Sequence, residues 1–207
     1  MSGGNTASPT ALIHAQSAIG RIASLLTRKR ALVTTLAVLA LLAAEYLGGH
    51  RPRDIGAWHD PSTMLALACV GLGLGLRTWA AGTLHKSTVL TTRGPYRWIR
   101  NPLYAGSFWL TAGFCALLGG GPHLLLVLIP ISWLYVLKVR KEERSLANSH
   151  GAAWAAYAGS TPRFIPRSLP RLDLADWRAT LWTRNHEYRA CLATVAGLVA
   201  LKLWHDL

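Results

Sequence analysis

The side chains best suited to chemistry lie in residues 93–104, which read RGPYRWIRNPLY. This stretch combines three arginines and three aromatic residues with a Gly-Pro turn, and apolar runs flank it. Pro102 suits the first turn of a helix, where its missing N–H would be unpaired in any case, and Asn101 before it is a favoured N-cap residue. A helix N-terminus attracts anions, and the arginines add positive charge beside it. We therefore predict a basic, aromatic loop that leads directly into a helix.

A second polar stretch, KVRKEERSL at residues 138–146, follows another apolar run. Lys138 and Glu142 are four residues apart and share one face of a helix, whereas Glu142 and Glu143 point about 100° apart. Taken alone, this pattern is also typical of a solvated helix with intrahelical ion pairs. Residues 150–166, HGAAWAAYAGSTPRFIP, then predict a short amphipathic helix that prolines end.

The composition indicates a membrane protein, because 51% hydrophobic and 15% charged residues among 207 are too apolar for an ordinary soluble domain. The candidate spans are each 15 to 17 residues long, near the short end of what a bilayer needs. They are residues 31–47, 63–79, 103–118 and 123–137, with a weaker fifth at 188–204. We predict an all-α, polytopic membrane bundle of four to five transmembrane helices.

The basic residues predict the orientation. Nineteen of the 22 Lys and Arg fall on one side of these spans, leaving only Arg51, Arg53 and Lys202 opposite. By the positive-inside rule, the N-terminus and both polar stretches are cytoplasmic. The net charge of +13 also favours contact with anionic membrane lipids. Nucleic acid is the alternative partner for such a charge, and we expect none because the basic residues are interleaved with spans.

The predicted organisation has three parts. Residues 1–30 form an N-terminal tail and an amphipathic helix, which lies in the membrane interface or packs on the protein itself. Residues 31–166 form the transmembrane core. Residues 167–207 form a C-terminal interfacial segment and a last helix, which spans, half-spans or lies on the membrane.

Two further patterns within the spans favour packing over ligand binding. Residues 70–77, VGLGLGLR, resemble a nucleotide-binding glycine loop, but no strand precedes them. Gly71 and Gly75 instead make a small-residue face on which membrane helices approach closely. The three cysteines each lie alone in an apolar run, with no spacing suited to zinc, so we predict no metal site.

Residues 103–137 predict a helical hairpin, because Gly119-Gly120-Gly121-Pro122 is too short for anything but a tight turn. The hairpin returns the chain to the cytoplasmic side. It therefore brings residues 93–104 next to residues 138–146.

Together, these pieces resemble the membrane methyltransferase family that contains isoprenylcysteine carboxyl methyltransferase and the phospholipid N-methyltransferases. The matching pieces are GPYRWIRNPLYAG at 94–106, EERSL at 142–146, the following HGAAWAAY, and PRFIP at 162–166. Membrane sterol reductases share a similar Gly-x-Tyr…Arg-x-Pro element. An NADPH-dependent membrane reductase is therefore one alternative, and a non-catalytic membrane scaffold is another.

The resemblance implies S-adenosylmethionine as cofactor, held in a cytoplasmic pocket. It places the cofactor contacts at Thr88, Val89, Leu90, Thr91, Tyr96, Arg100, Asn101, Pro102, Leu103, Tyr104 and Glu142. It places the catalytic groups at Glu142, Glu143, Lys138 and Arg140. Either glutamate would pair with the cationic end of the cofactor, and a tyrosine would face the sulfonium or stack on adenine. The chain departs from the family in having Asn101 for a histidine and Lys138 for an arginine.

The implied acceptor is lipophilic or prenylated. The resemblance is closest to protein-S-isoprenylcysteine carboxyl O-methyltransferase, and a phosphatidylethanolamine-type phospholipid N-methyltransferase is the nearest alternative. A carboxylate acceptor needs no general base, whereas an amine would have to lose a proton. His85 is the nearest candidate base in the loop.

Overall fold

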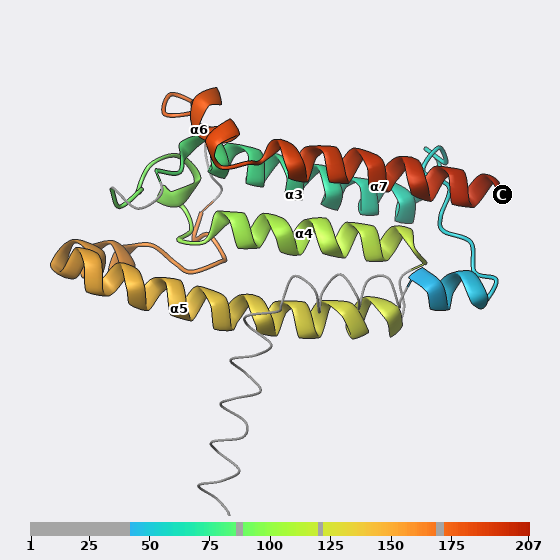
Figure 1. The fold of residues 1–207 in the computed structure, drawn as a ribbon, viewed down its shortest axis with the longest axis horizontal. Helices are drawn as coiled ribbons and strands as arrows, with labels where there is room; N and C mark the ends of the chain where they lie inside the picture. The colour runs from blue at the N-terminus through green and yellow to red at the C-terminus, as the bar shows by residue number, and fades with distance from the viewer. Residues whose placement is uncertain (1–41, 86–88, 120–121, 169–171) are drawn as a thin grey trace, which may run out of the picture. The chain divides into compact units, whose positions relative to one another are not determined.

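The computed structural model describes residues 42–85, 89–119, 122–168 and 172–207 (Figure 1). Within these ranges every regular element is a helix and there is no strand, which confirms the all-α class. Residues 1–41, with the predicted interfacial helix and most of the first span, lie outside the described residues, as does Thr88. The predicted boundaries at residues 30 and 166 stay predictions.

Helix α3 runs from Pro61 to Thr83. Asp60 caps its start, since the carboxylate accepts hydrogen bonds from the main-chain N–H groups of Ser62 and Thr63. Within the described ranges, α3 is the one helix that is both long and apolar enough to cross a membrane. It is helical throughout residues 70–77, so the glycine run there has no strand-loop-helix context for a nucleotide.

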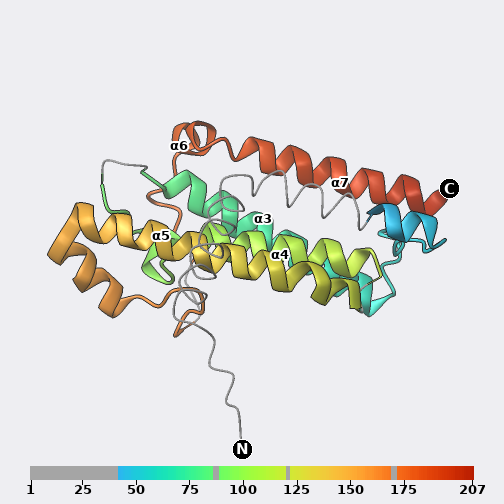
Figure 2. The same ribbon diagram turned by 60° about the horizontal axis from the view of Figure 1, so that its bottom comes forward.

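Helices α4 (Pro102–Leu117) and α5 (Pro122–Ser160) form the predicted hairpin and lie side by side (Figures 1 and 2). Helix α5 continues beyond Leu137 through the charged residues 138–146, as predicted. It bends sharply at Gly151, whose φ of 49° and ψ of −120° are not helical. Glycine adopts such a positive φ without strain. The bend turns residues 152–160 back toward the start of α4 (Figure 2).

Helices α3 and α4 pack closely through glycines, but not through the predicted pair. A Cβ atom at Gly73 would lie 2.5 Å from the Leu110 main-chain nitrogen, and one at Gly106 would lie 2.7 Å from the Gly73 carbonyl oxygen. A Cβ at Gly71 or Gly75 would meet no atom of the described residues within 4 Å. Among the described residues, no helix therefore packs on the predicted face at Gly71 and Gly75. Gly73, two residues from each, faces α4 because helical residues two apart point to different sides.

The C-terminal region adds α6 (Ala179–Arg184) and α7 (Tyr188–Asp206). The start of α7 lies against α3, where Cys191 Sγ is 3.9 Å from the Thr78 hydroxyl, and a Cβ atom at Gly197 would lie 3.0 Å from the Phe114 ring of α4. Side chains at spacings of three and four residues leave an exposed apolar stripe along α7, formed by Leu192, Val195, Val199 and Leu203. The helix predicted at 188–204 is confirmed, while its depth in the membrane is not shown.

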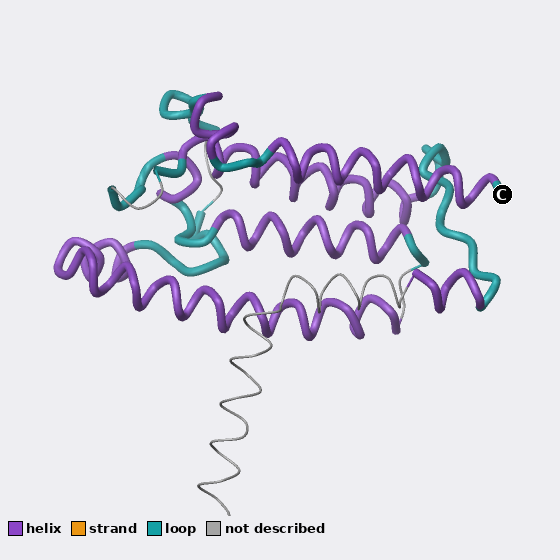
Figure 3. The backbone as a smooth tube through the Cα atoms, viewed as in Figure 1, coloured by secondary structure: helices purple, strands orange, loops and turns teal. Residues whose placement is uncertain are grey.

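Loops collect at the two ends of these helices (Figure 3). At one end, Arg53 pairs with Asp60 at 3.3 Å, and Lys202 pairs with Asp54 at 2.9 Å and with Asp206 at the same distance. The opposite end carries the arginine-rich loop, including the one-turn 3-10 helix η1 (Gly94–Arg97). The two ends thus differ in charge as the sequence predicts, and two bases of the first end, Arg53 and Lys202, are paired with acids.

Candidate functional site

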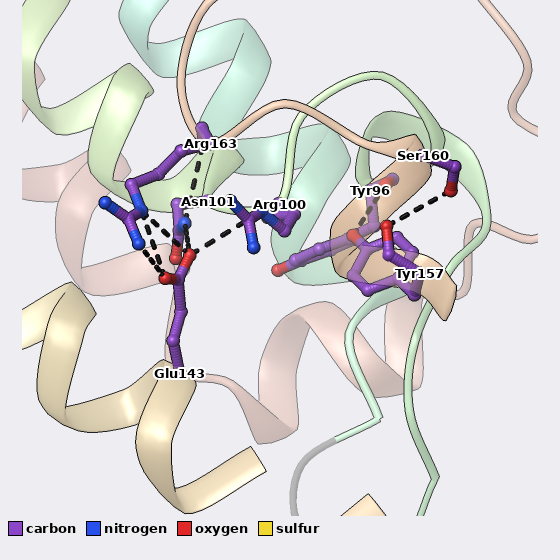
Figure 4. Close-up of polar contacts among 7 residues, drawn as sticks. All are labelled: Tyr96, Arg100, Asn101, Glu143, Tyr157, Ser160 and Arg163. Atoms are coloured by element: carbon purple, nitrogen blue, oxygen red, sulfur yellow. Dashed lines mark hydrogen bonds and ion pairs between the residues drawn. The ribbon is translucent and has the colours of Figure 1, made fainter. Parts of the chain in front are cut away.

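The junction between α4, α5 and the loop after α5 is built on Glu143, which is 7% exposed (Figure 4). Its carboxylate accepts hydrogen bonds from Asn101 Nδ2 at 3.1 Å and from Arg163 Nε at 3.0 Å. Arg100 Nε lies 3.7 Å from the same carboxylate. The predicted neighbourhood of the two polar stretches is therefore confirmed in its geometry.

The environment of Glu143 keeps it ionised. Burial alone would raise the pKa of this carboxyl, but the hydrogen bonds from Arg163 and Asn101 and the nearby charge of Arg100 outweigh it, so the pKa is lowered. The same hydrogen bond raises the pKa of Arg163. Because its oxygens are committed to these partners, Glu143 is placed to hold the junction together.

Asn101 stands at the N-cap position of α4, with Pro102 in the first turn as predicted. Its side chain, however, makes no capping hydrogen bond. The amide instead donates to Glu143 and, at 3.4 Å, to the Arg163 carbonyl oxygen. The predicted capping role of the side chain is wrong, because an ionised carboxylate attracts the amide donor.

The neighbouring Glu142 has a more open setting, with its side chain 45% exposed. Its Oε1 atom accepts a hydrogen bond from the Tyr104 hydroxyl at 2.8 Å and lies 3.3 Å from Lys138 Nζ. The Tyr104 ring also packs edge to face with Tyr135, with 5.4 Å between ring centroids. A half-exposed carboxylate beside two aromatic rings is suited to a cationic ligand.

Tyr96 is buried in η1, and its carbonyl oxygen accepts a hydrogen bond from the Tyr157 hydroxyl at 2.7 Å (Figure 4). The Tyr96 hydroxyl is buried and has no hydrogen-bond partner among the described residues. Burial raises its pKa, and the nearby Tyr157 and Glu142 raise it further. A neutral buried hydroxyl without a partner is unfavourable unless a ligand completes it.

Arg100 has a similar unsatisfied atom. Its Nε is buried without a hydrogen bond within the described part of the chain. The guanidinium carbon lies 5.8 Å from the centre of the Trp154 ring, a cation–π distance. Trp154 and Tyr157 thus both contact the loop 93–104 from the short helix after the Gly151 bend.

The other predicted residues are spread around this region. The Thr91 hydroxyl accepts a hydrogen bond from the His85 main-chain N–H at 3.1 Å, and the His85 Nδ1 lies 3.1 Å from the Thr83 carbonyl oxygen. Val89 is 62% exposed, and Arg140 is also exposed, so the structure does not bring either into the cluster around Glu142. Of the remaining three, Pro102 is buried, while Leu90 and Leu103 are half-buried.

Sequence reasoning missed three residues of the site: Tyr135, Tyr157 and Arg163. Tyr157 and Arg163 lie within the motifs HGAAWAAY and PRFIP, so the motifs contained a signal for them. Tyr135 lies inside an apolar run and gives no such signal.

Comparison with known proteins decides the family. The phospholipid methyltransferase family model matches residues 62–153. The chain is also 31% identical over 151 residues to the nickel-cobalt-cadmium resistance protein NccN of Alcaligenes xylosoxydans xylosoxydans, a match covering 70% of this chain and 68% of that protein. The chain belongs to the phospholipid methyltransferase family. No solved structure gives a significant match.

Membership of the phospholipid methyltransferase family indicates a membrane methyltransferase. The matched range contains the loop 93–104 and both glutamates, but ends before Tyr157, Arg163 and α7. The name of this relative refers to metal resistance and not to an enzyme. In the described part of this chain, no group of three or more His, Cys, Asp or Glu side chains is arranged to hold a metal ion.

Proposed function

We propose that this member of the phospholipid methyltransferase family transfers a methyl group from S-adenosylmethionine to a lipophilic acceptor, as protein-S-isoprenylcysteine carboxyl O-methyltransferase does. The observation that carries the proposal is the half-exposed Glu142 with its Tyr104 contact, beside a junction in which Tyr96 and Arg100 have unsatisfied buried polar atoms. Together they offer an anionic, a cationic and a neutral polar group, and S-adenosylmethionine carries cationic, anionic and neutral polar groups that could pair with them.

The residues fit the cofactor group by group. Glu142 offers a carboxylate to the cationic end, with the Tyr104 and Tyr135 rings close to it. Arg100 offers a buried N–H to a carboxylate, and the Tyr96 hydroxyl is left for a polar group of the ligand. Glu143 is already satisfied by Asn101 and Arg163, so its part is to hold these groups in place.

When bound, the cofactor supplies an electrophilic methyl group on a sulfonium. Glu142 would bind that positive charge in the ground state, and the charge disperses as the methyl moves, so strong pairing there does little for the rate. The contribution of the chain lies instead in alignment of the acceptor and in exclusion of water. Tyr96 and Ile99, next to the junction, are both buried, and such buried side chains would help to keep water out of the site.

The position of Lys138 supports a carboxylate acceptor. Its ammonium lies 3.3 Å from Glu142 Oε1, on the same helix face one turn earlier. A carboxylate acceptor would find a positive partner there and would need no general base. A protonated amine would meet the lysine as a like charge. We therefore favour an isoprenylcysteine-type carboxylate over the amine of phosphatidylethanolamine.

We further propose a multi-pass topology of four to five spans with the site on the cytoplasmic side. Support comes from the charge difference between the two ends and from α7, whose 19 residues carry an exposed apolar stripe. Nineteen helical residues extend about 28 Å, close to the thickness of the hydrocarbon core.

The acceptor is tested by incubating the detergent-purified protein with radiolabelled S-adenosylmethionine and either an N-acetylated prenylcysteine or phosphatidylethanolamine. We expect label in the prenylcysteine as a base-labile methyl ester. At S-adenosylmethionine concentrations well below its dissociation constant, Glu142→Gln should lower this incorporation about tenfold or more through weaker donor binding, the size expected for one charge-assisted contact. Base-stable label in phosphatidylethanolamine would show the N-methyltransferase alternative instead. Label in neither acceptor would overturn the proposed acceptor class.

A further inference from the structure

An ion pair between the partly buried Arg77 and the buried Glu187 joins three helices beside the site. Arg77 of α3 donates from Nε to Glu187 Oε1 at 2.8 Å and from Nη2 to Oε2 at 2.9 Å, and its Nη1 also contacts the Ser107 hydroxyl of α4. Glu187, immediately before α7, is 3% exposed. Such two-pronged pairs fix orientation closely. Buried ion pairs add little net stability relative to apolar packing, so a role in setting geometry explains this one better.

Glu187 ends a segment that holds the end of α3. We call residues 172–187 the clamp segment. The last carbonyls of a helix lack intrahelical partners, and the clamp segment supplies donors to carbonyls near this end. The donors and acceptors are Trp177 Nε1 to Thr78, the Arg178 main-chain N–H to Gly82, and Asn185 Nδ2 to Ala81.

The same end of α3 supports the loop 93–100. A Cβ atom at Gly94, where φ is 55°, would lie 3.0 Å from the Thr83 side chain and 3.4 Å from Trp79 Nε1. Trp79 Nε1 in turn donates to the Asp173 carbonyl oxygen of the clamp segment at 2.8 Å. An exposed ion pair of 3.2 Å between Arg93 and Asp176 joins the loop and the clamp segment directly. The clamp segment therefore contacts the loop that contains Tyr96.

We propose that the Arg77–Glu187 pair is a positioning element of the methyl-donor site: it fixes the clamp segment on the end of α3 and so sets the conformation of residues 93–100 and the direction of the Tyr96 hydroxyl. In the proposed function, neither Arg77 nor Glu187 touches the methyl donor or the acceptor. Glu187 also lies outside the range that the family model matches. The expected effect of the pair on affinity for the methyl donor rests on the proposed function. Its expected effect on the conformation of residues 93–100 does not.

The test compares Glu187→Gln with Lys202→Gln in the full-length, detergent-purified protein. Lys202 is a matched control, because it ties the other end of α7 to Asp54 through an ion pair of 2.9 Å. Hydrogen exchange at the main-chain amides of residues 93–100 should accelerate about tenfold in Glu187→Gln and stay unchanged in Lys202→Gln. Affinity for S-adenosylhomocysteine should fall about tenfold in the first variant only.

A double-mutant cycle with Tyr96→Phe tests whether the pair acts through Tyr96. The affinity loss caused by Glu187→Gln should become much smaller in the Tyr96→Phe background. If Glu187→Gln does not fold, Arg77→Leu/Glu187→Leu takes its place, since apolar residues can replace a buried pair. Unchanged exchange in residues 93–100, or an equal affinity loss in both Tyr96 backgrounds, would overturn the inference. Wild-type protein that does not bind S-adenosylhomocysteine would contradict the proposed function, while the exchange experiment would still decide the positioning role.

Discussion

Glu143→Gln is expected to destabilise the protein by about 2–3 kcal/mol, because it leaves Arg163 and Arg100 facing a neutral amide at a junction built for a carboxylate. This loss of stability is smaller than that expected for breaking a fully buried ion pair, because the Arg163 side chain is 40% exposed. In a chain of this length the melting temperature should fall by about 4–12 °C. Thermal unfolding of the detergent-purified protein, followed by intrinsic fluorescence, measures this change.

The adjacent glutamate provides the control. Glu142→Gln removes a carboxylate that is 45% exposed, so the cost to stability should stay below about 1 kcal/mol. The affinity for S-adenosylhomocysteine should fall more in Glu142→Gln than in Glu143→Gln, although the melting temperature of Glu142→Gln stays nearly unchanged. Equal thermal shifts in the two variants would contradict the assignment of a structural role to Glu143 and a ligand role to Glu142.

The stability contributed by Glu143 should also depend on pH. Folding lowers the pKa of Glu143, so its contribution is complete above the unfolded value of about 4.3 and is lost as the pH falls below that value toward the folded pKa. The difference in melting temperature between wild type and Glu143→Gln should therefore be full at about pH 7 and clearly smaller at about pH 3.5. A difference that does not change with pH would show that the Glu143 charge contributes nothing to stability.

Gly73→Ala is expected to separate α3 from α4. The added methyl group would lie 2.5 Å from the Leu110 nitrogen and 2.7 Å from the Gly106 carbonyl oxygen. Both are main-chain atoms that cannot rotate away, so the cost should reach about 3 kcal/mol, the upper end for overpacking. Because α3 and α4 support η1 and Asn101 from two sides, the yield of folded protein and its ligand binding should fall together.

Gly75→Ala is the matched control, two residues further along the same helix. Its Cβ would meet nothing within 4 Å in the part of the chain that the structure describes, and alanine favours a helix over glycine. We expect an unchanged or slightly higher melting temperature. Tolerance of alanine at Gly73, or an equal loss at Gly75, would show that the close contact between α3 and α4 is not as described.

The sequence predicts the meeting of the two polar stretches because the reasoning needs only helix continuity and a short turn. The hydrogen bonds from Tyr104 to Glu142 and from Asn101 to Glu143 confirm it. The angle between the two glutamates shows that they face different directions, but not which one is buried. That depends on Arg163, which reaches Glu143 only because the chain bends at Gly151.

Other features could not be predicted because they depend on distant partners. Arg77 and Glu187 are 110 residues apart, and nothing in the sequence links them. Along α3, several glycines could form a packing face, and only the position of α4 shows that Gly73 does. The number of spans, the cofactor and the acceptor stay predictions, which the experiments above address in part.

The most direct test of the central claim is calorimetric titration of the detergent-purified protein with S-adenosylhomocysteine and, separately, with NADPH. We expect one molecule of S-adenosylhomocysteine to bind per chain, this binding to weaken about tenfold or more in Glu142→Gln, and NADPH not to bind. Binding of NADPH in place of S-adenosylhomocysteine, or of neither, would contradict the assignment of a methyl-donor site to the groups around Glu142 and Tyr96.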